Sequence, residues 1–235
     1  MGAGQTLATD MAIARPKTKP VVAEANRFAA LWERNVVSPR SPDAAAVYAD
    51  LSALYAAPFR KFHNLGHIED CLRKFEEVAP MLIDRDAVEF ALWFHDAVYQ
   101  TGAATNELRS AELFLELTPG AKFRFRSRVC SLIMATRHNR KVRGNDKCFI
   151  VDIDLAGFGA SWEDFMHSGD LLRQEAANQT EQQYQAAQVV FLSRLQRRRT
   201  VYCTEYFRDR YEAKARENLR RILSDLAAKG HVAAR

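Results

Sequence analysis

Two short stretches decide the fold of this chain: Phe-His-Asn-Leu-Gly-His at residues 62–67 and Trp-Phe-His-Asp-Ala-Val-Tyr at residues 93–99. They contain three of the six histidines and are joined by a segment of helical length. Apolar residues in that segment recur at steps of three and four, which is the spacing of one helix face. We therefore expect a helix that opens at His63 or Asn64 and closes near Leu82. Its buried face comprises Leu65, Ile68, Leu72, Phe75 and Val78.

Helical patterns continue on both sides of this centre. Asp84 is a favourable cap for the next helix, which carries His95 on its apolar face. The run Cys148–Val151 could pass for a strand, but no partner strand is evident, so we interpret it as the buried entry to a helix that begins at Asp152 or Asp154. The other expected helices are Val22 to about Ser38, Ser41 to before Pro58, Asn106–Leu117, Lys122–Thr136, Trp162–Ala177, Glu181–Arg197 and Thr204–Lys229. The sequence thus predicts one compact all-α domain of about eight to ten helices.

Length and composition fit a single globular domain. The chain has 235 residues, of which 48% are hydrophobic and 27% charged, enough to bury a sizeable core. Residues 1–20 lack a sustained apolar period and are expected to be a disordered lead-in, so the domain is assigned to residues 21–230. The sequence shows neither a secretory signal nor a membrane-spanning run, which predicts a cytoplasmic protein. Its four cysteines form no metal-binding pair motif and are expected to be reduced.

The charge of the chain gives little support to nucleic-acid binding. The net charge is +5, and the one basic cluster, Arg197 to Arg199, has no aromatic residues interleaved with it. We interpret this cluster as a solvated helix end, and a nucleic-acid binder ranks last among the possible functions. The expected partner is a small molecule, and neither a membrane nor a nucleic acid is expected; a homodimer is left open.

The densest chemistry lies in the histidine stretches. His63 and His67 are four residues apart, so both lie on one helix face. His95 and Asp96 add neighbouring nitrogen and oxygen donors. A carboxylate from Asp152 or Asp154, at the mouth of a buried segment, would complete a four-ligand set. Imidazole with carboxylate suits Mn, Fe or Zn, and the scarcity of clustered carboxylates argues against a dedicated calcium site.

Together these residues resemble the HD-domain superfamily of metal-dependent phosphohydrolases, through His67, His95-Asp96 and an aspartate near position 154. More narrowly, the chain is similar to a bacterial subfamily of predicted HD phosphohydrolases from about Glu24 to Leu226. The motifs that carry the similarity are Pro58-x-Arg60-x-x-His63-Asn64-x-x-His67, Trp93-Phe94-His95-Asp96-x-Val98-Tyr99, Asn106-Glu107-x-x-Ser110-Ala111, Ala135-Thr136-x-His138, Asp152-x-Asp154-Leu155, Arg173-x-Glu175 and Ala215-Arg216-x-Asn218-Leu219.

The resemblance implies hydrolysis of a nucleotide or related phosphate ester by a metal-activated hydroxide. The divalent ion, Mn, Fe, Zn or Mg, would be held by His67, His95, Asp96 and one aspartate. We favour Asp154 as this ligand, with Asp152 orienting a histidine, although the reverse assignment stays open.

Other polar residues are assigned roles around this centre. His63 occupies the position that protonates the leaving oxygen in cyclic-nucleotide phosphodiesterases, against the alternative of a capping or core histidine. Glu107 is expected to position the attacking water or to support a ligand, and a first-turn acid that stabilises its own helix is equally plausible. His138 is expected near a second metal or the substrate, or at a helix end on the surface. The candidate phosphate-binding cations are Arg60, Lys61, Arg109 and Arg137.

One departure from the family pattern limits the transfer of mechanism. Tyr99 stands where some nucleotidase members have an acid, so a nucleotidase mechanism does not carry over directly. Two alternative functions are also kept open, the first of them indicated by His63-Asn64. One is a phosphodiesterase acting on a cyclic or linear nucleotide diester, and the other is a catalytically silent nucleotide-binding regulatory module.

Overall fold

The computed structural model describes residues 21–36, 39 and 41–231. The lead-in assigned to residues 1–20 lies outside them. The described chain is all-helical and contains no strand, which confirms the predicted fold class. Its α-helices are α1 (Val21–Asn35), α2 (Ala44–Tyr55), α3 (Leu65–Val78), α4 (Arg85–Phe94), α5 (Asn106–Leu117), α6 (Phe123–Ile133), α7 (Asn145–Asp154), α8 (Trp162–Glu175), α9 (Glu181–Arg197), α10 (Glu205–Phe207) and α11 (Ala213–Ala228).

Helix α4 is the centre of the first half of the molecule. Every residue from Ala87 to Phe94 is buried, and the helix packs against α1, α3, α5, α6 and α7. A helix that is apolar around its whole circumference belongs in a protein interior. Asp86 lies in the first turn, and the one acid in the buried part, Glu89, is paired with Arg27 at 2.6 Å. Because α4 is held on all sides, the residues at its C-terminal end, beginning with His95, are fixed in place.

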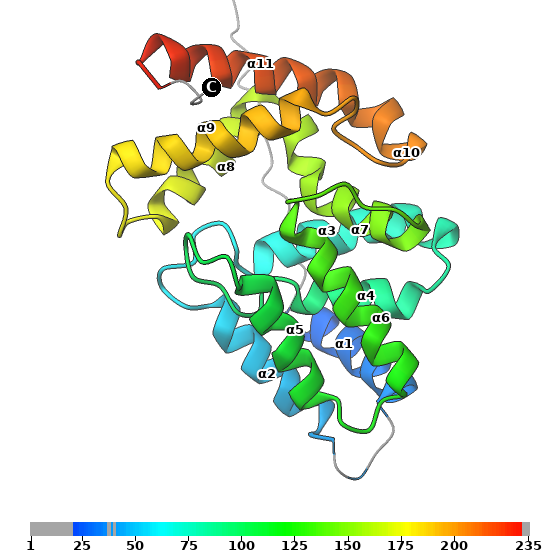
Figure 1. Ribbon diagram of the computed structural model, residues 1–235. Coiled ribbons are helices and arrows are strands. Elements are labelled where there is room, and N and C mark those ends of the chain that lie inside the picture. Colours follow the sequence, from blue (N-terminus) through cyan, green and yellow to red (C-terminus); the bar gives the residue numbers. More distant parts are fainter. Residues whose placement is uncertain (1–20, 37–38, 40, 232–235) are drawn as a thin grey trace, which may run out of the picture.

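The second half of the molecule forms a separate layer. In Figure 1 the yellow-to-red helices α8, α9 and α11 lie together above the blue-to-green helices α1 to α6. Helix α11 packs against α9, and α7 contacts α3, α4 and α6 in the first layer. Asn218 of α11 anchors the connection after α7 by donating to the carbonyl oxygens of Phe158 and Ala160, at 2.9 and 3.0 Å. The chain therefore passes from one layer to the other directly after α7.

Side-chain caps start the helices that carry the histidines. The Asn64 side chain accepts a hydrogen bond from the amide of Gly66, and Asp84 accepts one from the amide of Ala87. Both caps agree with the prediction. Helix α2 was expected from Ser41 but begins at Ala44, because its cap is Asp43. A cap satisfies amides that have no partner within the helix, so it fixes the residue at which the helix begins.

Two of the predicted helices differ from those in the structure. Helix α7 begins at Asn145 and ends at Asp154, whereas a helix was expected to begin at Asp152 or Asp154. Phe149 and Ile150 are therefore helical, since burial inside a short helix gives the same apolar run as a buried strand. The last expected helix is interrupted by a π-helical segment, Arg208–Glu212. No helix in the described part of the chain has the length and apolarity required to cross a membrane.

Candidate metal centre

The centre of the site is a pair of imidazole rings. His67 lies in the first turn of α3 and His95 directly follows α4, and their Nε2 atoms are 3.3 Å apart. The His95 Nδ1 atom lies 2.9 Å from the carbonyl oxygen of Leu92. A carbonyl only accepts hydrogen bonds, so Nδ1 carries the hydrogen and a neutral His95 presents the lone pair of Nε2 to the centre.

Two carboxylates complete the group around these nitrogens. The Asp96 Oδ2 atom lies 3.2 Å from Nε2 of His95 and 3.7 Å from Nε2 of His67. Asp154, at the end of α7, places Oδ1 3.3 Å from His67 and 3.6 Å from His95. Donors bound at about 2.1 Å to one ion lie about 3.0 Å apart at a right angle and about 3.4 Å apart at the tetrahedral angle. The separations between the histidines and the carboxylates therefore fit a common metal ion.

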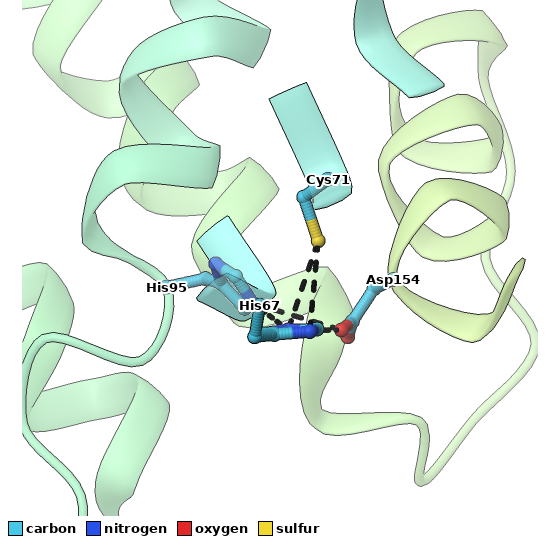
Figure 2. Close-up of side chains that lie close together, drawn as sticks. All are labelled: His67, Cys71, His95 and Asp154. Atoms are coloured by element: carbon cyan, nitrogen blue, oxygen red, sulfur yellow. Dashed lines mark hydrogen bonds and ion pairs between the residues drawn. The ribbon is translucent and has the colours of Figure 1, made fainter. Parts of the chain in front are cut away.

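Cys71 also approaches the pair, which the sequence reasoning missed. Its Sγ atom is 3.7 Å from Nε2 of His67, and Figure 2 shows it pointing toward the two rings from the next turn of α3. Donor atoms of His67, Cys71, His95 and Asp154 all lie within 4.8 Å of one another, so this group can hold a metal ion. Burial raises the pKa of the Cys71 thiol well above its ordinary value. The available signal was its position four residues after His67.

The electrostatics of the centre favour a cation. The His95 side chain is only 1% exposed, and each of the two aspartate side chains is 14% exposed. Burial alone lowers the pKa of His95, but Asp96 and Asp154 outweigh burial and hold this pKa well above its usual value. The pKa of Asp154 is held well below its usual value, since hydrogen bonds from His138, His67 and His95 outweigh its burial. A field that stabilises an added proton here also stabilises a metal cation.

His138 lies at the edge of this centre. Its Nε2 atom is 2.7 Å from Oδ2 of Asp154, so the two oxygens of Asp154 face different histidines. His138 has a φ of 52°, the only positive φ of a non-glycine residue among those that the structure describes. Such backbone conformations are costly and persist where surrounding contacts hold them. Here Arg198 donates to the His138 carbonyl oxygen at 2.8 Å. The structure therefore places His138 beside the ligand set.

Glu175 joins the site from the end of α8. Its Oε2 atom lies 2.6 Å from Nδ1 of His63, while Oε1 accepts from the amides of Phe62 and His63 at 2.9 and 2.8 Å. The His63 ring is stacked on Tyr99, with ring centroids 4.1 Å apart. Burial alone raises the pKa of Glu175. Its contacts with His63 outweigh burial, so the net pKa lies below the ordinary value. In the sequence Glu175 appears only in the Arg173-x-Glu175 motif, and its contact with His63 was not predicted because the two residues lie 112 positions apart.

Asp152 does not orient a histidine, which corrects its predicted role. Oδ1 accepts from the Cys203 amide, and Oδ2 accepts from the Thr204 amide and hydroxyl, each at 2.7 Å. Asp152 is fully buried, and burial raises its pKa to about 6 although these hydrogen bonds oppose the shift. Asp152 thus binds the segment after α9, through Cys203 and Thr204, to α7. Of the two candidate aspartates, only Asp154 has its carboxylate at the histidine pair.

Arg60 also differs from its expected role. Its guanidinium donates to the carbonyl oxygens of His63, Asp96 and Ala97 at 3.0, 2.7 and 2.8 Å. Arg60 is only 6% exposed. Its two terminal nitrogens therefore join the two histidine stretches, and they are not free to hold a phosphate.

The remaining predicted residues lie outside the ligand group. Lys61 and Arg109 are exposed, and within the described chain no hydrogen bond or ion pair joins either to the histidine pair. Glu107 faces Arg137 at 3.8 Å, and Arg137 donates to the carbonyl oxygen of Ala104 at 2.8 Å. Neither Glu107 nor Arg137 makes a polar contact with the ligand group in the described structure.

Comparison with protein-family models, with curated proteins and with solved structures found no match to this chain.

Proposed function

We propose that this protein is a metal-dependent phosphohydrolase that acts on a nucleotide or a related phosphate ester. One observation carries the proposal: Nε2 of His67 and of His95 face each other at 3.3 Å, with Asp96 and Asp154 oxygens between 3.2 and 3.7 Å from them. Two imidazoles and two carboxylates suit Mn, Fe or Zn, and Mg is the remaining candidate. Such an ion, when bound, polarises phosphoryl oxygens and lowers the pKa of water.

The chain supplies a candidate proton donor beside this centre. His63 has its Nδ1 atom engaged by Glu175 at 2.6 Å, which leaves Nε2 for a proton transfer to the leaving oxygen of the substrate. The ring is held between this carboxylate and the stacked Tyr99 ring, and its centroid lies 5.9 Å from that of His67. A fixed acid close to the reacting phosphate lowers the cost of expelling an alkoxide. In this proposal Glu175 is a positioning residue for His63.

The same observation favours phosphodiester cleavage as a second candidate. A diester leaves an alkoxide that requires a proton, and His63 with Glu175 would provide one. The products separate the two candidates. Hydrolysis of a monoester releases inorganic phosphate, whereas cleavage of a cyclic nucleotide or another nucleotide diester releases a nucleoside monophosphate.

The test is metal analysis of the purified protein combined with a hydrolysis assay on nucleotides and a generic phosphate ester. We expect Mn-loaded protein to be active, a chelator to remove the activity, and His95→Ala or Asp96→Ala to lose at least about 100-fold, since even residues that only support a ligand contribute 10–100-fold. His167→Ala is the matched control, because this histidine is exposed on α8. Equal activity in the wild type and both ligand variants would contradict the proposal.

A further inference from the structure

Six exposed cations lie on two distant segments that meet at His138, the neighbour of the candidate ligand Asp154. We call this surface the basic rim. Three of its members follow His138 and three lie at or after the end of α9. The members are Arg140, Lys141, Arg143, Arg194, Arg197 and Arg199.

A direct contact brings the two segments together. Arg198 donates to the carbonyl oxygen of His138 at 2.8 Å, and the His138 ring lies 6.4 Å from that of Phe191 in α9. The sequence between 137 and 143 and between 194 and 199 contains no acid. The cluster of Arg197 to Arg199, which resembled an ordinary helix end in the sequence, thus lies beside a second basic segment in the fold.

The basic rim has no carboxylate partner among the described residues, where none of its six side chains forms an ion pair or a hydrogen bond. Several arginines elsewhere are paired with acids: Arg216 pairs with Glu212 at 2.8 Å, and Arg128 pairs with Asp146. Like charges gathered without counter-ions raise the free energy of the folded state and attract anions. A ligand with several negative charges would compensate these cations.

The position of the rim links it to the metal centre. His138, whose carbonyl holds the two segments together, has its Nε2 atom 2.7 Å from Oδ2 of the candidate ligand Asp154. A phosphate ester bound at the metal centre would thus have the rest of its chain within reach of the rim. A single phosphate monoester carries about two negative charges, so it would leave most of these cations uncompensated.

We propose that the basic rim binds the phosphate backbone of a single-stranded nucleic acid and leads its end toward the metal centre. The inference rests on the proposed function for the chemistry at that end. No aromatic residue lies within 139–143 or 194–199, so the contacts are to phosphates and not to stacked bases. A single strand is favoured because the candidate ligands are 1–14% exposed, and a rigid duplex cannot bend into a buried site.

Fluorescence anisotropy with a labelled 20-nucleotide oligothymidine and oligouridine, on metal-free full-length protein, tests the binding. Contacts with four or five phosphates predict a slope of log affinity against log salt of about −3, or a loss of about 60-fold between 50 and 200 mM KCl. We expect the triple variant Arg140→Gln, Lys141→Gln, Arg143→Gln to bind at least about tenfold more weakly, with a shallower slope. The equivalent variant of Arg194, Arg197 and Arg199 should behave in the same way.

The matched control removes three cations from elsewhere. Arg85, Lys122 and Arg124 are also exposed, and their triple glutamine variant should bind within about twofold of the wild type. Absence of salt-dependent binding, or an equal loss in the control, would overturn the inference. Stronger binding of inorganic polyphosphate at the same phosphate concentration, or preference for a duplex, would also overturn it.

The binding experiment and the hydrolysis experiment test the two proposals separately. Hydrolysis of a small phosphate ester by the unaltered Mn-loaded protein tests the metal centre, and binding by metal-free protein tests the rim. Hydrolysis without oligonucleotide binding would contradict only the inference drawn from the rim. Binding without any hydrolysis would contradict the proposed function.

Discussion

Two aspartates on one turn of α7 have opposite surroundings. Among the described residues, Asp152 accepts from the amides of Cys203 and Thr204 and from the Thr204 hydroxyl, whereas Asp154 faces the imidazoles of His67, His95 and His138. Both belong to the same buried motif in the sequence. Amide donors satisfy a carboxylate completely and make it structural, whereas imidazoles offer nitrogens that can also bind a metal. The type of partner, more than burial, distinguishes a candidate metal-binding acid from a structural one.

Other acids extend this comparison. Asp146, in the first turn of α7, accepts from the amides of Ile83 and Asp84 at 2.8 and 3.1 Å and from Arg128. It therefore resembles Asp152. Glu175 is intermediate, because one of its oxygens faces amides and the other faces His63. Substitutions at these four acids should separate effects on activity from effects on folding.

The largest effect is expected for Asp154→Asn. The substitution removes a charged oxygen from the centre while nearly preserving the shape of the side chain. Metal content should fall at least about tenfold and hydrolysis at least about 100-fold, whereas the midpoint of urea unfolding should change little. Plasma mass spectrometry for metal and initial rates would measure this. Full metal content in the variant would contradict the assignment of Asp154, and not Asp152, as the metal ligand.

Asp152→Ala should act on stability instead. It leaves the amides of Cys203 and Thr204 buried without an acceptor, which costs about 2–4 kcal/mol of unfolding free energy. Asp152→Asn keeps one acceptor and should cost about half as much. Urea denaturation followed by circular dichroism gives the free energies. Metal content per folded molecule should stay at the wild-type value, and its loss without destabilisation would show that Asp152 acts at the centre.

Glu175→Gln should lower kcat about 10–100-fold without changing metal content, because the amide supports His63 more weakly than the carboxylate. The loss should be greater for an alkyl phosphate ester than for a nitrophenyl ester, since a poor leaving group depends more on a proton donor. The Glu175→Asp variant should keep part of the kcat that Glu175→Gln loses. Glu163→Gln, an exposed acid on the same helix, is the control. Equal losses of kcat for both esters would contradict the proposal that Glu175 positions His63.

The smallest effect is expected for Asp146→Asn, and it should depend on pH. Burial raises the pKa of Asp146, but hydrogen bonds from Arg128 and the Ile83 amide outweigh it, and the net pKa is lowered. A lowered pKa in the folded state contributes stability above the unfolded value of about 3.9 that disappears as pH falls through the folded value. We expect a loss of about 1–2 kcal/mol at pH 7 that shrinks below about pH 4. Urea titrations at pH 7, 5 and 3 check this, and a constant difference would contradict it.

The sequence by itself determined the elements that depend on nearby residues. Apolar steps of three and four set the helices, and Asn64 and Asp84 set where α3 and α4 begin, because helix periodicity and capping act within a turn or two. The same local pattern brought out His67, His95 and Asp96 as a candidate set. The extent of α7 was not recoverable, since a short apolar run fits both a strand and a buried helix.

Only the tertiary structure decided which distant groups meet. The choice between Asp152 and Asp154 depends on how the end of α7 is oriented, and a rotation of about 200° around the helix separates these two side chains. Glu175 reaches His63 across 112 positions, and Arg198 reaches His138 across 60. Such contacts follow from the packing of two helical layers, which no local spacing encodes. The candidate metal ligands His67, His95 and Asp96 could therefore be found from local patterns, while the distant groups that contact them were set by the fold.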